Sequence, residues 1–259
     1  MLNWTAFTEA QLLLFALIFL RMIAFVVASA FFGAGTIPTP VKILLSLILS
    51  VLMYPLVKIG NVDYLVISNE IVSLAAREII VGLSLGFLTR IFFFVVSMVG
   101  DLIAMSVGLS AGQMFNPLLG TSGNAMESFY TSLGTLVFLA INGHHILIRA
   151  ILESYTLVSV SSMSLNVGPF AEMAMFGQTA MILTIKMCAP VLVTIILVNL
   201  AMGILGRAVP QINVLVTSMP VTIMIGMTVV FICLPLMISE MHGLVEITAS
   251  NLFKVMKAM

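Results

Sequence analysis

Among the stretches of this sequence that contain no charged residue, three long apolar ones restrict its possible folds more than any other feature. They are Met22–Val41, Met187–Gly206 and Ala208–Ser239. An α-helix rises about 1.5 Å per residue, so about 20 apolar residues cross a hydrocarbon core about 30 Å thick. Because 61% of the 259 residues are hydrophobic and only 8% are charged, the chain has too few polar side chains to cover a water-facing surface. The sequence therefore predicts an integral membrane protein.

The apolar stretches predict α-helices, because none alternates between polar and apolar residues for long, as strands of a membrane barrel do. Clusters of Gly, Pro and Asn divide the chain into about seven or eight helical pieces. We expect an all-α, multi-helix membrane protein whose first helix, Gln11–Phe32, is retained and not cleaved as a signal. The clusters lie at Gly33–Pro40, Gly60–Asn61, Gly108–Asn124, Asn142–Gly143, Asn166–Pro169 and Val209–Asn213.

Charged residues lie inside several of the expected spans. Arg21 lies in the first span, and Glu70, Arg77 and Glu78 lie in a third span that continues to Phe94. A charge near the centre of a bilayer costs at least ~2.5 kcal/mol on insertion scales, so such residues tend to face protein or water, or lie near an interface. Two interpretations remain open. The charges are anchors or ion pairs between subunits, or they line a path for ions or substrate.

The segment Gly108–Asn124 contains four glycines, one proline and no charge. Gly and Pro interrupt helices, and Asn and Ser compete for backbone hydrogen bonds, so we expect much of the segment to be non-helical. Non-helical backbone at membrane depth is tolerated where protein buries it or where it lines an aqueous cavity. An ordinary surface loop is the alternative that remains open. The candidate pore residues are Gly108, Gly112, Gln113, Met114, Phe115, Asn116, Pro117 and Leu118.

No catalytic, metal or cofactor motif is expected. His144 and His145 do not form the HExxH pattern, and a zinc site needs three or four ligands; P-loop and GxSxG motifs are missing from the sequence. Cys188 and Cys233 are isolated in apolar runs, so they fit no CxxC site. Ten basic and ten acidic residues give a net charge of zero, which does not favour binding to nucleic acid.

Several short motifs resemble the FliR family in both sequence and order. They are Pro38 before Lys42, Ala76-Arg77-Glu78 followed by Gly82–Phe87, Asn142–His145, and Arg207–Asn213. The resemblance covers nearly the whole chain. It implies a subunit of the flagellar type III protein-export gate in the bacterial inner membrane, at the flagellar basal body. The implied partners are FliP-like and FliQ-like subunits, a FlhB-like switch subunit, exported unfolded proteins and membrane lipid.

The same resemblance implies an internal organisation. A FliP-like helical region covers residues 1–168, and a FliQ-like helical hairpin with a C-terminal tail covers 169–259. The family also has a loop that plugs the gate lumen, and 108–124 has the matching character and place. The tip of the hairpin, Arg207–Asn213, is implied to contact the FlhB-like subunit. The residues expected at subunit contacts are Arg77, Glu78, Arg207, Pro210, Gln211 and Asn213.

Two other functions are compatible with parts of the sequence. A secondary transporter would use Arg77, Glu78 and Asp101 as coupling residues within broken helices. An intramembrane enzyme would use His144 and His145. Co-purification separates these classes, because a gate subunit needs its partner subunits for stability and a transporter is stable alone or as a homo-oligomer.

Overall fold

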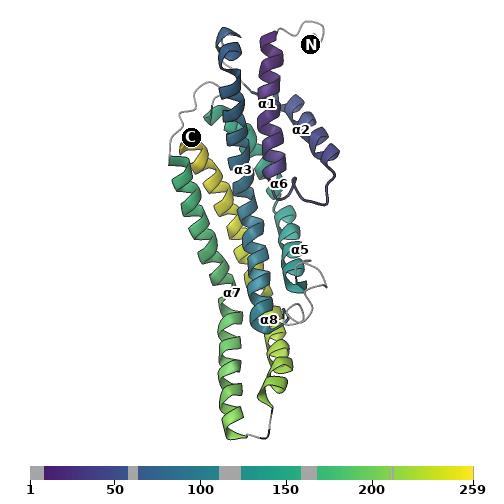
Figure 1. The fold of residues 1–259 in the computed structure, drawn as a ribbon, viewed down its shortest axis with the longest axis vertical. Helices are drawn as coiled ribbons and strands as arrows, with labels where there is room; N and C mark the ends of the chain where they lie inside the picture. Colours follow the sequence, from purple (N-terminus) through teal and green to yellow (C-terminus); the bar gives the residue numbers. More distant parts are fainter. Residues whose placement is uncertain are drawn as a thin grey trace. The chain divides into compact units, whose positions relative to one another are not determined.

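The computed structural model describes residues 9–57, 64–110, 124–158, 168–209, 211 and 213–258. Within these residues it contains helices and no strands, which confirms the all-α prediction (Figure 1). The helix breaks lie at or beside the Gly, Pro and Asn clusters of the sequence. The helices are α1 (Glu9–Ala28), α2 (Thr39–Met53), α3 (Tyr64–Val107), α5 (Ala125–Ala140), α6 (Gly143–Leu157), α7 (Gly168–Ala208) and α8 (Val214–Ala258).

Four of the described helices are long and apolar enough to cross a bilayer. Helices α5 and α6 pass the same test only as a pair, and they are bent by 66° where they meet. Asn142 lies at this bend with a left-handed φ of 57°, a conformation that Asn tolerates better than most residues. The candidate spans are Gln11–Ala28, Ile71–Val107, Ala171–Ala208 and Val216–Ala258. The chain is therefore a membrane protein, as its composition predicts.

Two helix lengths differ from those expected. α1 ends at Ala28 and not at Phe32, because the Ser29 hydroxyl donates to the carbonyl of Val26 (3.1 Å) and accepts the N–H of Phe32 (3.2 Å). These local bonds stabilise a turn in place of another helical turn. α3 continues past Phe94 to Val107. A charged side chain does not interrupt the backbone hydrogen bonds of a helix. The charges within α3 therefore reflect what surrounds the helix and not where it ends.

The chain forms two compact units. The first comprises residues 1–91, 142–177 and 247–259, and the second comprises 92–141 and 178–246. In the first unit, glycines of α3 allow close packing against α1. A Cβ atom at Gly82 would lie 2.4 Å from the carbonyl oxygen of Arg21, and one at Gly86 would lie 2.4 Å from Cβ of Ala28. This Gly82–Gly86 spacing is the GxxxG arrangement by which membrane helices approach each other closely.

The second unit also has close helix contacts centred on glycine. A Cβ atom at Gly100 of α3 would lie 2.6 Å from Cα of Glu127 in α5. A Cβ atom at Gly226 of α8 would lie 2.6 Å from the side chain of Val107. Cys188 is fully buried, and its thiol lies 3.7 Å from the carbonyl oxygen of Val99. Cys188 is thus a small core residue, as its apolar sequence context predicts.

Candidate functional site

A buried ion pair joins α1 to α3 in the first unit. The guanidinium of Arg21 donates from Nε to Oε2 of Glu78 (2.5 Å) and from Nη2 to Oε1 (2.9 Å). The Arg21 side chain is 0% exposed and that of Glu78 is 3% exposed. Two parallel bonds between a guanidinium and a carboxylate are the strongest common geometry for such a pair. Glu78 is one of the residues expected at a subunit contact, and within the chain its carboxylate binds Arg21.

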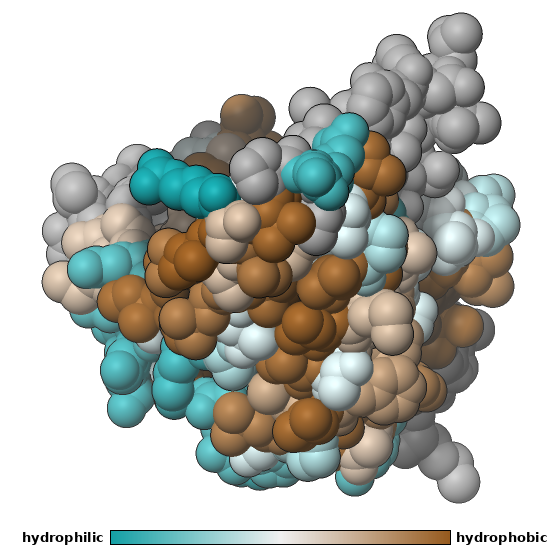
Figure 2. Space-filling view, turned by 90° about the horizontal axis from the view of Figure 1, so that it is seen from below, coloured by the Kyte–Doolittle hydropathy of each residue, from teal (hydrophilic) through white to brown (hydrophobic). Residues whose placement is uncertain are grey.

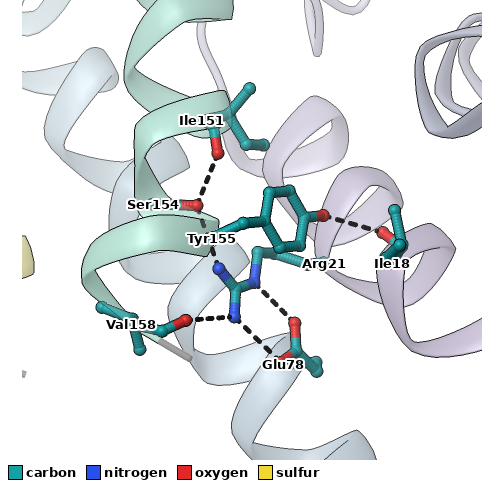
Figure 3. A network of polar contacts seen from close by, with 7 residues as sticks. All are labelled: Ile18, Arg21, Glu78, Ile151, Ser154, Tyr155 and Val158. Carbon is teal, nitrogen blue, oxygen red and sulfur yellow. Dashed lines mark hydrogen bonds and ion pairs between the residues drawn. The ribbon is translucent and has the colours of Figure 1, made fainter. Parts of the chain in front are cut away.

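The remaining donors of Arg21 are satisfied by α6 and the residue that follows it. Nη1 donates to Oγ of Ser154 (3.0 Å), and Nη2 donates to the carbonyl oxygen of Val158 (3.1 Å) (Figure 3). The ring of Tyr155 lies against the guanidinium, with 4.2 Å between Cζ and the ring centroid. The Tyr155 hydroxyl donates to the carbonyl oxygen of Ile18 in α1 (3.1 Å). One arginine therefore holds three helices together.

The role of Arg21 in this network is missed by sequence reasoning. Arg21 is conspicuous as a charge in an apolar run, and the cost of an isolated charge there predicts that it has some partner. The sequence does not show which of several acidic residues is that partner, because Arg21 and Glu78 are separated by 57 positions. One feature of the sequence points to the partner of Arg21. Glu78 is one of the few carboxylates that lie inside another expected span.

In the second unit, the two ends of the segment 108–124 have distinct local structures. Gly108 has a φ of 92°, where glycine is favoured, and it follows the last residue of α3. At the other end, Oδ1 of Asn124 accepts the N–H of Glu127 (2.8 Å) and so caps α5. The Asn124 amide donates to Oδ1 of Asp101 in α3 (2.6 Å). These contacts bind the end of the segment to the helix from which it departs.

A second bond strengthens this junction. The Ser97 hydroxyl donates to Oε1 of Glu127 (2.7 Å), one helical turn before Asp101. α3 and α5 are thus fixed to each other by two side-chain bonds at the base of the segment. The candidate pore residues Gly112, Gln113, Met114, Phe115, Asn116, Pro117 and Leu118 lie outside the described residues.

The expected turn between α7 and α8 agrees with the helix ends, since α7 ends at Ala208 and α8 begins at Val214. Arg207, Gln211 and Asn213 are exposed, and Pro210 lies outside the described residues. The carbonyl oxygen of Asn213 accepts the N–H groups of Val216 (3.2 Å) and Thr217 (3.1 Å), so Asn213 begins the first turn of α8. Of the remaining expected contact residues, Arg77 is half-buried.

Large apolar side chains are exposed along the second unit. On α7 they include Ile196 (65% exposed) and Ile204 (62%), and on α8 they include Phe231 (70%) and Ile232 (72%). Figure 2 shows apolar side chains over much of the surface that faces the viewer. Contiguous apolar surface of this kind marks contact with lipid or with other proteins.

The two histidines of the enzyme alternative lie side by side at the start of α6. The rings of His144 and His145 lie 4.2 Å apart between centroids. No group of three His, Cys, Asp or Glu residues within the described ranges is placed to hold a metal ion. The next polar residues along α6, Arg149 and Glu153, form an exposed ion pair of 2.8 Å with each other.

Comparisons with known proteins identify a consistent set of relatives. The family model of bacterial export proteins, family 1, matches residues 12–247. The chain is 29% identical to the flagellar biosynthetic protein FliR of Bacillus subtilis over 241 residues, which cover 92% of each chain. It is 28% identical to FliR of Aquifex aeolicus over 248 residues, which cover 95% of this chain and 92% of that one. It is 25% identical to FliR of Escherichia coli over 217 residues, which cover 84% and 82%.

Proposed function

This chain belongs to the FliR family of bacterial export proteins, and on that basis we propose that it is a subunit of the flagellar type III protein-export gate. Its family and its apolar helices make it a membrane-embedded flagellar export protein. In the proposed gate it joins FliP-like and FliQ-like subunits to form a channel through the inner membrane. The channel conducts unfolded flagellar proteins.

The observation that carries this proposal is the length of the apolar helices. α7 has 41 residues and α8 has 45, so they are about 62 Å and 68 Å long, about twice the thickness of a hydrocarbon core. Exposed apolar side chains of α7 extend from Met175 to Leu205. Lipid tails cover only part of such a length, and water does not cover the rest favourably. Other protein subunits are therefore needed to bury it.

Charged residues in α7 and α8 support the same conclusion. Lys186 of α7 and Glu240 of α8 form an ion pair of 2.8 Å, and their side chains are 62% and 26% exposed. Lys186 lies within the candidate span Ala171–Ala208. A partly exposed ion pair in a lipid-facing position is costly, whereas a protein assembly supplies polar groups and excludes lipid.

Co-purification tests this proposal. A tagged chain, expressed with the other flagellar export subunits and solubilised in a mild detergent, is expected to bring FliP-like and FliQ-like proteins with it. Expressed without the FliP-like protein, it is expected to be degraded or aggregated, because its long apolar surface then lacks a protein partner. A well-folded monomer that binds no export subunit would overturn the proposal.

Within this gate, we propose that the segment 108–124 closes the lumen. Its Gly, Pro and Asn content supports this role, as do the two hydrogen bonds that the Asn124 side chain makes at its end. Apolar residues such as Met114, Phe115 and Leu118 would seal the lumen by contact, and the glycines would let the seal deform around cargo. Deleting Ala111–Leu119 is expected to raise the leakage of small ions through the assembled gate. If the deletion leaves the ion conductance of the gate unchanged, the segment does not plug the lumen. The assignment of the chain to the gate would still stand.

A further inference from the structure

A narrow exposed stripe runs along α3 in the first unit and contains a single cation. Its members are Ala76, Ile80, Leu83, Phe87 and Arg90, and we call it the α3 seam. Ile80 is 37% exposed, Leu83 45% and Phe87 50%. Ile79, beside Ile80, is 37% exposed as well. The members recur every three or four residues, so they lie on one face of α3. The α3 seam is therefore a continuous, mainly apolar face of this helix.

The opposite side of the same part of α3 is already occupied. Val81, Leu85 and Leu88 are buried, with 1% or less of their surface exposed. Gly82 and Gly86 lie against the backbone or side chains of α1. α3 is therefore held from one side by its own chain, and the α3 seam is the side left for an external contact.

Arg90 makes lipid an unfavourable occupant of this seam. Its side chain is exposed, and none of the described residues forms an ion pair or hydrogen bond with it. The stretches on either side, Ile79–Thr89 and Ile91–Gly100, contain no charge. A guanidinium in such an apolar surface is costly in lipid, and a carboxylate that accepts two of its N–H groups removes much of that cost.

We propose that the α3 seam binds a helix of another export-gate subunit, and that this helix presents a carboxylate to Arg90. The inference rests on the proposed function and names the kind of surface that assembles the gate. A straight stripe on one helix face suits a helix as its partner, the apolar members suit an apolar contact face, and Arg90 suits an acidic residue within it. A second copy of this chain fits less well, because a parallel two-fold pair would place Arg90 opposite Arg90.

Photo-crosslinking at Phe87 tests the contact in the full export apparatus. A photoreactive residue at position 87 is expected to capture one other gate subunit, at a helical peptide with Asp or Glu within about one turn of the crosslink. The control places the photoreactive residue at position 44 of α2. Leu44 is 57% exposed but lies outside the seam. Capture of lipid alone at position 87, or of a second copy of this chain alone, would overturn the inference.

Charge variants then test the role of Arg90. Arg90→Met is expected to lower the yield of the Phe87 crosslink and of the co-purified subunit about tenfold or more, because it leaves the carboxylate of the partner unpaired. Arg90→Lys is expected to retain most of the yield. Arg149→Met is the matched control, since it removes an exposed arginine that already pairs with Glu153. Equal yields from Arg90→Met and the wild-type chain would contradict the proposal.

Two outcomes separate this inference from the proposed function. If the chain co-purifies with gate subunits while position 87 captures lipid, the seam is not the interface and the gate assignment stands. If the wild-type chain captures no gate subunit from any position and co-purifies with none, the gate assignment itself fails. The melting temperature of each solubilised variant shows that a lost crosslink is not caused by unfolding.

Discussion

Arg21 and Glu78 lie 57 positions apart in the sequence, and their side chains form a doubly hydrogen-bonded ion pair that is almost fully buried. Arg21→Met would leave the carboxylate of Glu78 buried without its counter-ion. Removing one partner of a buried pair typically destabilises a protein by about 3–5 kcal/mol. We expect a lower melting temperature in detergent and less full-length chain in membranes.

Two further variants show whether the ion pair itself causes this loss. Arg21→Met combined with Glu78→Met removes both charges, and it is expected to recover much of the lost stability because no unpaired charge remains. Arg149→Met breaks the exposed Arg149–Glu153 pair and is expected to leave the melting temperature unchanged. A double variant that is less stable than either single variant would show that the pair contributes through something other than its charge.

Close approach of α1 and α3 leads to a second prediction. A leucine at Gly86 is expected to force the helices apart, because even its Cβ atom would lie 2.4 Å from Cβ of Ala28. The control is Gly203→Ala in α7, where nothing lies within 4 Å of the added atom. That change should be neutral or stabilising by up to about 1 kcal/mol, because alanine favours helix more than glycine does. Equal melting temperatures for the two variants would contradict the packing described for Gly86.

The junction at the base of segment 108–124 leads to a third prediction. Asn124→Ala removes the cap of α5 and the bond to Asp101, which are 2.8 Å and 2.6 Å long. Loss of a helix cap costs about 0.5–2 kcal/mol. If the segment plugs the lumen, releasing its end should raise small-ion leakage in membrane vesicles. Asn213→Ala, which alters the start of α8 instead, should leave the leakage at the wild-type level.

A fourth prediction concerns the turn between α7 and α8. Arg207→Glu is expected to impair export without lowering the melting temperature, because Arg207 is exposed and forms no ion pair with any of the described residues. Cysteines at Gln211 or Asn213 are expected to crosslink to the FlhB-like subunit. Normal secretion by the Arg207 variant, together with crosslinks to no gate subunit, would reduce the turn to a purely structural connection.

Much of the helical organisation could be predicted from the sequence because it depends on local chemistry. Gly, Pro and Asn clusters interrupt helices whatever surrounds them. The breaks beside Gly108 and Asn142 could therefore be predicted from the sequence alone. The end of α1 at Ala28 is harder to predict from the sequence, because it depends on how the hydroxyl of Ser29 bonds to nearby backbone. Lys186 does not interrupt α7, which shows that a charge within an apolar run is a poor sign of a helix end.

The contacts that hold the helices together depend on residues far apart in the chain. The sequence marks Arg21 as needing a partner but does not identify Glu78, and it gives no sign that Ser154 and Val158 complete the site. The bond between Asp101 and Asn124 is similar, since the two residues lie 23 positions apart in the sequence. Family resemblance supplies the expected role of the chain, but such pairings follow from three-dimensional packing.

Secretion of flagellar proteins measures directly whether this chain acts in the flagellar export gate. In a motile strain whose copy of this gene is deleted, hook and filament proteins are expected to be synthesised but not to reach the medium. Expression of the wild-type chain is predicted to restore their secretion. Secretion at the wild-type level in the deletion strain would contradict the claim that this chain is a subunit of the flagellar export gate.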